Sequence, residues 1–521
     1  MKNRIITILA LAMMLGVTSC HEEADVQMNY SQNDKVSFLE AYDSYVGKFR
    51  VLWNAININY GLWDYEADCG VDWDDVYKEM LPKFQELDSL DQVPDTLLQR
   101  LLNEMIEPLH DGHMTVTVIN HKTNTPVLVS PSALRNVQRA DVEEVRSFET
   151  SLKAYAENKE LSDYKSETTM AIDLFYSMNY TEGIGFQWAK AKAEELSVKS
   201  DLTAKEATTL VGLKGFLAEM TSIQNYVKQG GINKEIIDAY NNVVLKYTYL
   251  NIPFLESIDP EFVDSGVRVT FGQFNDGIVY FSTNHFRLSA YLDSSFFNEK
   301  FGSADTHTLA QADMIKTVWS SWFNAIQRLY KAGKLKGVIV DVRNNGGGYQ
   351  SDTRYLLGCL QPAGGFQIGY SRFKRGLGRY DYSPMMPNIM LTMDEEHVIV
   401  NDVPVVVLTN LNSVSMSEMT ALTCKQMPNG CVIGRRSWGG VCGLTGNDSF
   451  STDYAGKIGI EGVTPVAVYM PTQCNFDMDK KSMEGIGVEP DIEVAYDRKK
   501  FTSTGYDSQL DRALEYIRSK N

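Results

Sequence analysis

Apolar positions in the first hundred residues follow the period of a helix. Large apolar side chains recur at about every third or fourth position within two stretches: Phe38, Tyr42, Tyr45, Phe49, Trp53, Val76, Met80 and Phe84. This spacing is typical of amphipathic helices, and Asp95 is a plausible N-cap for one more. Near Thr115 the pattern changes to that of a strand. The pattern predicts an N-terminal helical subdomain over residues 36–125.

The next segment keeps helical spacing but differs in composition. No proline occurs between Pro131 and Pro253, and Glu, Lys, Ala and Leu dominate. Apolar residues recur there at helical spacing. We therefore predict a helical insertion over residues 126–250.

Strand patterns return in the rest of the chain. Residues 267–271 alternate, Asp276-Gly277 is a turn signal, and residues 278–281 continue as a strand. An amphipathic helix is expected over residues 315–329. Short apolar runs typical of buried strands follow at 338–342, 403–408 and 431–434. The alternation of strands and helices predicts an α/β layer domain over residues 251–521.

The N-terminus has the pattern of an export signal. A basic start, residues 1–4, precedes an apolar stretch, residues 5–17, and then Val17-Thr-Ser-Cys20. The cysteine after small residues resembles a bacterial lipoprotein box, which implies a signal peptide over 1–19 and lipidation of Cys20. An ordinary signal peptide with a chance cysteine is the alternative. Residues 20–35 are polar and are expected to form a tether.

Charge and cysteine content narrow the classes of function. The 521 residues carry a net charge of −18, which argues against binding nucleic acid or anionic lipid. Contact with a membrane is therefore expected only through the lipid on Cys20. Six cysteines follow Cys20, and an exported protein can form disulfides. No Cys-x-x-Cys occurs, and no pairing follows from the spacing.

A glycine loop ends one of the buried strands. Residues 337–348 read Gly-Val-Ile-Val-Asp-Val-Arg-Asn-Asn-Gly-Gly-Gly. Such a loop can turn sharply and aim backbone N–H groups at an anion. The loop lacks the Gly-Lys-Ser/Thr of a P-loop. On its own it also fits a tight turn.

Three serines follow the strand at 403–408, at its junction with a predicted helix. They are Ser413, Ser415 and Ser417, and Glu418 comes directly after them. A hydroxyl there lies close to helix N-terminal amides, which stabilise a developing anion. The local sequence alone fits helix capping equally well.

A histidine pair precedes the first strand. Leu109-His-Asp-Gly-His113 places His113 at a loop-to-strand junction, where functional side chains are common. The spacing of His110 and His113 suits two metal ligands, but no carboxylate-bearing partner motif accompanies it. We therefore predict no metal site.

Together these segments resemble the superfamily of tail-specific (C-terminal processing) proteases, the tricorn protease core and interphotoreceptor retinoid-binding protein. The glycine loop is similar to its DLRxNxGG segment, and residues 413–418 to its SASASE motif. Residues 432–434 resemble the following strand, residues 483–491 the closing GV-x-PD segment, and residues 109–113 the LxDGH segment of the tricorn-like branch. The resemblance covers about residues 50–125 and 265–495. It implies a crotonase/ClpP-like α/β catalytic domain with the helical subdomain and the insertion attached.

Carried over by position, the resemblance makes Ser415 the nucleophile. The tail-specific branch takes its base from a lysine that falls at position 440, and here Gly440 stands there. The tricorn-like branch uses Ser, His and Glu, which implies His113 as base and Glu484 as third member. The N–H groups of Gly347 and Met416 are the implied oxyanion hole. His110 is the rival base.

Two further departures bear on the prediction. Residues 435–439, Arg-Arg-Ser-Trp-Gly, match only half of a Gly-x-Ser-x-Gly elbow, so Ser437 is discounted. No PDZ-like segment is recognisable, which puts recognition of substrate C-termini in doubt.

The resemblance implies a serine peptidase that cleaves peptides or unfolded proteins through an acyl-enzyme without metal or organic cofactor. The leader places it in the bacterial cell envelope, lipid-anchored to the outer membrane on its periplasmic or outer side. A non-catalytic ligand- or peptide-binding lipoprotein on the same fold is the alternative. A second alternative is a scaffold protein that binds a partner through the helical insertion.

Overall fold

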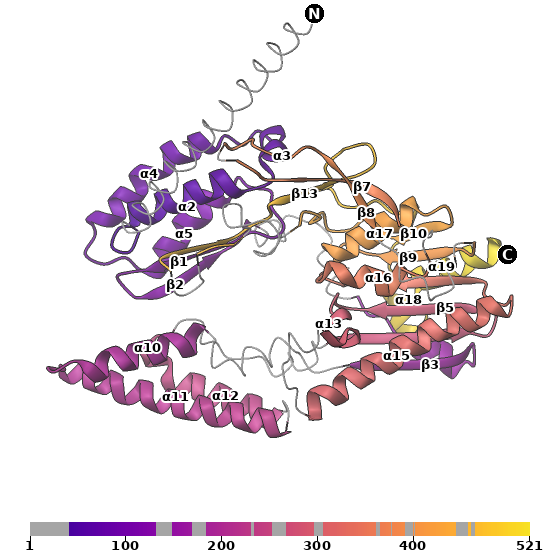
Figure 1. Ribbon diagram of the computed structural model, residues 1–521, viewed down its shortest axis with the longest axis horizontal. Coiled ribbons are helices and arrows are strands. Elements are labelled where there is room, and N and C mark those ends of the chain that lie inside the picture. Colours follow the sequence, from indigo (N-terminus) through magenta and orange to yellow (C-terminus); the bar gives the residue numbers. More distant parts are fainter. Residues whose placement is uncertain are drawn as a thin grey trace, which may run out of the picture.

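The computed structural model describes most of the chain after residue 40 (Figure 1). The described residues are 41–131, 148–168, 184–230, 234–252, 267–295, 306–360, 365–376, 378–390, 400, 402–443, 457–459 and 464–520. The predicted signal peptide (1–19), the lipidation site Cys20 and the tether (20–35) lie outside them. Within these ranges, no helix combines the length and the apolar character needed to cross a bilayer.

A seven-stranded mixed sheet forms the centre of the C-terminal half. Its order is β14-β10-β9-β6-β5-β4-β3, in which β5 to β14 are parallel and β4 and β3 are antiparallel to their neighbours. The strands are β3 (Leu161–Thr168), β4 (Arg268–Phe274), β5 (Ile278–Thr283), β6 (Gly337–Asp341), β9 (Val405–Thr409), β10 (Gly430–Gly434) and β14 (Ile492–Glu493). The prediction of an α/β layer domain is confirmed.

Helices cover both faces of this sheet. One face packs against α13 (Ser289–Leu292), α15 (Thr306–Lys331), α16 (Thr353–Leu357) and α17 (Met416–Gln426). The other face packs against α8 (Lys153–Glu157) and α19 (Ser508–Lys520). Every residue of β6 and β9 is buried, because parallel strands between two helical layers have no solvent face. The short helix α18 (Arg498–Thr504) precedes α19.

A second unit contains the predicted N-terminal helices (Figure 1). They are α2 (Tyr45–Asn59), α3 (Trp63–Asp68), α4 (Trp73–Ser89) and α5 (Asp95–Ile106). They pack on a four-stranded sheet in the order β11-β12-β1-β2, with β1 (Thr115–Asn120), β2 (Thr125–Val129), β11 (Lys457–Ile458) and β12 (Val466–Tyr469). Two of its strands come from the C-terminal half. The subdomain predicted over 36–125 therefore shares its core with residues from the predicted catalytic domain.

A three-stranded sheet lies between the two units. Its order is β13-β7-β8, with β7 (Phe366–Phe373), β8 (Met386–Met390) and β13 (Gln473–Phe476). Arg372 of β7 reaches Asp64 of α3 with a 2.6 Å ion pair. This sheet therefore ties the α/β half to the N-terminal helices.

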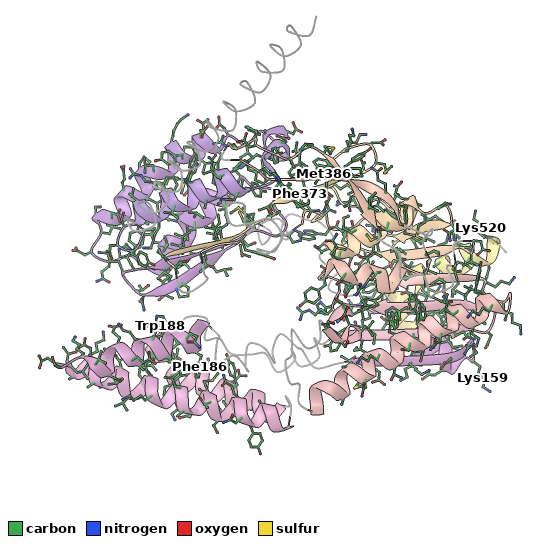
Figure 2. All side chains as sticks on the ribbon, viewed as in Figure 1. Lys159, Phe186, Trp188, Phe373, Met386 and Lys520 are labelled. Atoms are coloured by element: carbon green, nitrogen blue, oxygen red, sulfur yellow. The ribbon has the colours of Figure 1, made fainter. Side chains whose placement is uncertain are left out.

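The predicted insertion is helical only in part. The helices α10 (Ile184–Val198), α11 (Ala204–Gly230) and α12 (Lys234–Tyr247), followed by the 3-10 turn η1 (Thr248–Leu250), share a core of their own. Phe186 and Trp188, labelled in Figure 2, are half-buried against that core. The all-helical prediction over 126–250 is wrong for β3, whose side chains alternate between half-buried and exposed along the edge of the main sheet. An edge strand such as β3 carries many charged and few apolar residues, so the alternation typical of a strand is hard to recognise in its sequence.

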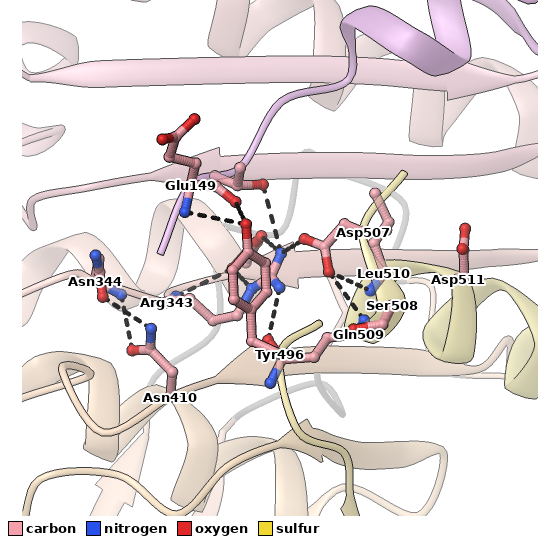
Figure 3. A network of polar contacts seen from close by, with 12 residues as sticks. Glu149, Arg343, Asn344, Asn410, Tyr496, Asp507, Ser508, Gln509, Leu510 and Asp511 are labelled. Atoms are coloured by element: carbon pink, nitrogen blue, oxygen red, sulfur yellow. Dashed lines mark hydrogen bonds and ion pairs between the residues drawn. The ribbon is translucent and has the colours of Figure 1, made fainter. Parts of the chain in front are cut away.

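A buried ion-pair network closes the end of β6, where the glycine loop begins (Figure 3). Arg343 donates to Asp341 at 2.9 and 2.5 Å and lies 2.7 Å from Asp507. Asp507 also accepts the N–H groups of Gln509 and Leu510 at the start of α19. The three charged side chains are almost fully buried. One guanidinium thus fastens the glycine-loop strand to the C-terminal helix.

We expect the loss of Arg343 to be much more damaging than the loss of Asp507. Arg343→Leu leaves two carboxylates buried without a cation and should lower the free energy of unfolding by about 3–5 kcal/mol. Asp507→Asn leaves a neutral Asp341–Arg343 pair, so a loss of about 1–2 kcal/mol is expected. Urea unfolding monitored by circular dichroism measures both. Arg518→Leu, which removes an exposed pair with Asp276, is the control and should cost at most about 1 kcal/mol. Equal losses for Arg343→Leu and the control would contradict the network's importance.

Candidate active site

Ser415 stands at a strained turn between β9 and α17. Its φ is 57° and its ψ −114°, a conformation that non-glycine residues rarely adopt. Strain of this kind costs about 1–3 kcal/mol and is concentrated at functional sites. The turn resembles in outline the strand-to-helix elbow that presents a nucleophile in other hydrolases. Ser415 is half-buried, so its side chain remains accessible.

The other candidate serines have structural partners. Ser413 Oγ donates to the carbonyl of Val342 at 2.8 Å, and Ser417 Oγ donates to the carbonyl of Asn345 at 2.7 Å. Ser437 Oγ donates to Glu418 Oε1 at 2.6 Å. All three serines are fully buried. Ser415 differs from these three serines in being only half-buried, and its side chain forms a capping box with Glu418 at the start of α17.

The glycine loop packs directly against the Ser415 turn. A Cβ added to Gly347, whose φ is +92°, would lie 2.7 Å from Ser415 Cβ and 2.8 Å from the carbonyl oxygen of Val414. Only glycine allows so close an approach. Asn345 fixes the contact, because its carbonyl accepts the N–H of Val414 at 3.0 Å. The sequence therefore needs glycine at 347 for a packing reason as well as for a backbone one.

The two predicted oxyanion donors differ in their hydrogen bonds. The N–H of Gly347 donates to Asn345 Oδ1 at 2.9 Å, so it is committed within its own loop. The N–H of Met416, at the first turn of α17, has no acceptor among the described residues. With this geometry, Met416 N–H stays a predicted oxyanion donor. Gly347 stays a predicted oxyanion donor only if the loop adopts a form in which the hydrogen bond from Gly347 N–H to Asn345 Oδ1 is broken or shared.

Glu418 connects the nucleophile turn to the loop that follows β10. Its Oε2 accepts the N–H of Ser415 at 3.0 Å and that of Gly440 at 2.8 Å. Its Oε1 accepts Ser437 Oγ and the N–H of Gly439, each at 2.6 Å. The side chain is fully buried. Burial raises the pKa of Glu418, and the four donated hydrogen bonds act in the opposite direction.

Glu484 is held by the same loop from its other side. Its Oε2 accepts the N–H groups of Val441 and Cys442 at 2.9 and 3.1 Å. Its Oε1 accepts the N–H of Gly112 at 3.3 Å. Gly112 directly precedes His113, so this buried carboxylate lies beside the backbone of the histidine segment.

Gly440 marks the place where the segments meet. A Cβ added there would lie 3.2 Å from Val414 Cγ1 and 3.3 Å from His113 Cε1. Val414 is the neighbour of Ser415, so the imidazole of His113 and the Ser415 turn flank the same glycine. A lysine at 440, as in the tail-specific branch, would extend into the space beside His113. The structure therefore brings the segments of Ser415, His113 and Glu484 together.

The rival base His110 has a different partner. Its Nδ1 lies 2.8 Å from Glu66 Oε2, and its N–H donates to Glu66 Oε1 at 2.7 Å. Asp111 Oδ1 accepts the N–H of His113 at 2.5 Å and also that of Met114. This turn directs His110 towards α3, while His113 begins the approach to β1. No group of three or more potential ligands suited to a metal ion occurs in the described part of the chain.

Sequence reasoning overlooked two residues that position the site. They are Glu418 and Asn345. Both lie within the motifs described above, but no structural role was predicted for either of them. A charged residue inside an otherwise small-residue turn, followed by an apolar helix, was the available signal for Glu418. For Asn345 the available signal was its place in a loop that must turn sharply.

Residues 291–494 match the Peptidase family S41. The tricorn protease of Thermoplasma acidophilum is 27% identical over 198 residues, which are 37% of this chain and 15% of that protein. The chain thus spans less than a fifth of the length of this relative. A putative peptidase from Parabacteroides merdae superposes with a TM-score of 0.49 at 17% identity, covering 92% of this chain and 98% of that one. Mature CPAF complexed with lactacystin gives 0.44 at 10% identity, covering 92% and 97%.

We expect Glu418→Gln to weaken the fold around the site. The amide nitrogen would face backbone N–H groups, so at least one buried donor loses its acceptor, and a loss of about 2–4 kcal/mol is expected. Glu489→Gln makes the same change at an exposed residue near Arg436 and should stay within about 0.5 kcal/mol. Urea unfolding of the two variants side by side tests this. Equal stability of both would show that the four hydrogen bonds do not matter to the fold.

Asp352 should make stability depend on pH. It follows the glycine loop, accepts the N–H groups of Leu288 and Ser289, and is fully buried. Burial raises the pKa of Asp352 to about 6, above its ordinary value of 3.8. The folded state therefore favours the protonated form, and its stabilising effect is lost as pH rises from about 4 to above 6.

The comparison of wild type with Asp352→Asn isolates this effect. The stability of the wild type relative to the variant should fall by about 2–2.5 kcal/mol between pH 4 and pH 7. Urea unfolding at the two pH values measures it, and Asp276→Asn, an exposed change, should follow the wild type. A difference that does not change with pH would contradict the raised pKa.

Proposed function

Because residues 291–494 match the Peptidase family S41 and a similar stretch resembles tricorn protease, we propose that this chain is a serine peptidase with Ser415 as nucleophile. The observation that carries the proposal is the strained, half-buried Ser415 turn beside the His113 segment. A serine hydroxyl is a weak nucleophile until a neighbouring base accepts its proton. In this proposal His113 is that base, and Ser415 Oγ attacks the carbonyl carbon of the scissile peptide bond.

Glu484 acts on His113 in the proposed mechanism. A buried carboxylate beside an imidazole orients it and stabilises the cation formed when the proton arrives. Two backbone N–H groups fix Glu484, which supports a positioning role rather than a mobile one. His113 then gives its proton to the leaving amine, and the acyl-enzyme on Ser415 is hydrolysed by water. No metal or organic cofactor takes part in this scheme.

The oxyanion is proposed to rest on the N–H of Met416. That N–H is at the N-terminus of α17, where the helix dipole favours negative charge. Gly347 is the proposed second donor. Since its N–H donates to Asn345 Oδ1, we propose that substrate binding shifts the glycine loop and frees it. Donors of this kind lower the barrier by about 3–4 kcal/mol each.

The proposed substrates are peptides or unfolded proteins in the bacterial cell envelope. The leader, with Cys20 as its lipidation site, supports an outer-membrane lipoprotein. A folded protein does not readily present an extended peptide bond to a nucleophile. The N-terminal helices and the insertion are proposed to restrict access to the site.

A non-catalytic binding protein on this fold is the second candidate. The observation that favours it is the bond between Gly347 and Asn345, which leaves the oxyanion hole incomplete. An enzyme and a binding protein differ in the reactivity of Ser415, which can be measured directly.

We expect a fluorophosphonate probe to label the wild-type chain on Ser415. Ser415→Ala should abolish labelling, and His113→Ala should slow it by roughly 100-fold or more because general-base catalysis is lost. His110→Ala should stay within a few-fold, since His110 is bound to Glu66. The rate of labelling is measured on variants whose circular dichroism matches that of the wild type.

Each outcome has a distinct meaning. Labelling that survives Ser415→Ala would show that another serine is the nucleophile. Equal slowing by His110→Ala and His113→Ala would refute the choice of base. A folded wild type that is never labelled would favour the binding protein.

A further inference from the structure

Cys442 and Cys474 stand opposite each other on two antiparallel backbone segments. The neighbouring residues Gly443 and Gln473 exchange two hydrogen bonds, with the N–H of Gly443 donating at 2.9 Å and that of Gln473 at 3.2 Å. In antiparallel pairing the next opposed pair is not hydrogen-bonded, and its Cα atoms lie about 4.5 Å apart. A disulfide needs a Cα separation of roughly 4.4–6.8 Å. The backbone therefore already has a spacing that a disulfide requires.

The two side chains also point to the same side. Both belong to the hydrophobic core of the N-terminal unit, and both are buried, with exposures of 1% and 3%. The thiol of Cys474 is a hydrogen-bond partner of the Cys442 thiol. It also approaches the carbonyl of Gly61 at 2.6 Å. Opposed backbones and a shared core place the two sulfur atoms together.

Two other cysteines that are close in sequence are not placed opposite each other in this way. Cys424 and Cys431 are separated by one short turn, but they lie on opposite faces of the seven-stranded sheet. Cys424, a residue of α17, belongs to the core on one face, while Cys431 packs with Leu510 and Leu514 of α19 on the other. The structure thus favours a pair that is distant in sequence.

We propose that Cys442 and Cys474 form a disulfide when the chain matures in oxidising surroundings. The oxidant is an external disulfide, either oxidised glutathione or a thiol–disulfide oxidoreductase. One cysteine thiolate attacks the external S–S bond and releases one thiol, and the second cysteine then displaces the other. Two protein S–H bonds are lost, one protein S–S bond forms, and the two electrons reduce the external disulfide to two thiols.

The bond forms during folding rather than afterwards. Exchange requires a thiolate, and burial raises the pKa of the Cys442 thiol well above its ordinary value. Both sulfur atoms are also closed to a reagent once the core has packed. The disulfide is therefore a permanent link and not a reversible switch. The predicted leader would take the chain to a compartment where such bonds persist.

The link would reinforce the attachment of Glu484. Cys442 N–H donates to Glu484 Oε2, and a Cβ added to Gly440, two residues earlier, would contact both His113 and Val414. A disulfide at 442 holds this segment to β13, which is itself paired with β7. This inference does not depend on whether Ser415 is a nucleophile, because it concerns a covalent bond and not a reaction with substrate.

Peptide mapping of the wild-type chain tests the bond. The full chain is refolded in a glutathione redox buffer, unfolded without reductant in iodoacetamide, and digested with trypsin. Cleavage after Arg436, Lys457 and Lys480 gives residues 437–457 and 458–480, each with a single cysteine. We expect these two peptides to be joined, and the peptides that contain Cys359, Cys424 and Cys431 to be alkylated. Alkylation of both Cys442 and Cys474, or a different pairing of either, would overturn the proposal.

Thermal unfolding supplies a second measurement. Dithiothreitol, present during refolding, should lower the midpoint of the wild type by roughly 5–10 °C, because the loop between the cysteines is no longer closed. The double variant Cys442→Ala/Cys474→Ala should show no such shift, whereas Cys69→Ala, an exposed change, should keep it. An equal shift in the double variant would count against the bond. If that variant does not fold, the mapping of the wild type decides alone.

Discussion

The carboxylate of Glu418 is the constraint on which the rest of the site depends. It is fully buried and is surrounded by four donors, two of which are the N–H groups of Ser415 and Gly440. A buried charge is tolerated only when hydrogen bonds replace its hydration. The nucleophile turn and the loop beside His113 therefore cannot move apart without exposing that charge to an apolar interior. The strain at Ser415 persists because an unstrained backbone there would break the hydrogen bonds to Glu418.

Much of the α/β half could be predicted from the sequence. Parallel strands between two helical layers are apolar throughout, so runs such as Val405–Leu408 are easily recognised. The glycine loop and the serine motif stand out because they break those runs with residues of special conformation. The assignments of Ser415, His113 and Glu484 remain predictions, and the structure adds that their segments meet at Gly440.

Other features could not be predicted, for physical reasons. The edge strand β3 carries few apolar residues, because only part of it faces a core, so its pattern is weak. Strands β11 and β12 complete a sheet more than three hundred residues away in sequence, and no local pattern encodes such a pairing. The same applies to Cys442 and Cys474, whose opposition depends on backbone pairing alone. The hydrogen bond between Gly347 and Asn345 likewise follows from the local turn and is invisible in a motif.

The pairing of β1 with β12 has a consequence for the order of biosynthesis. The strand that follows His113 finds its partner only after residues 466–469 have been made, and Glu484 comes later still. The chain is made from its N-terminus, and domains generally fold as units once their residues are available. The histidine-bearing unit therefore stays unfinished through most of translation. A chain that stops early lacks Glu484 and the strands that hold the histidine segment, so the site is complete only in a finished molecule.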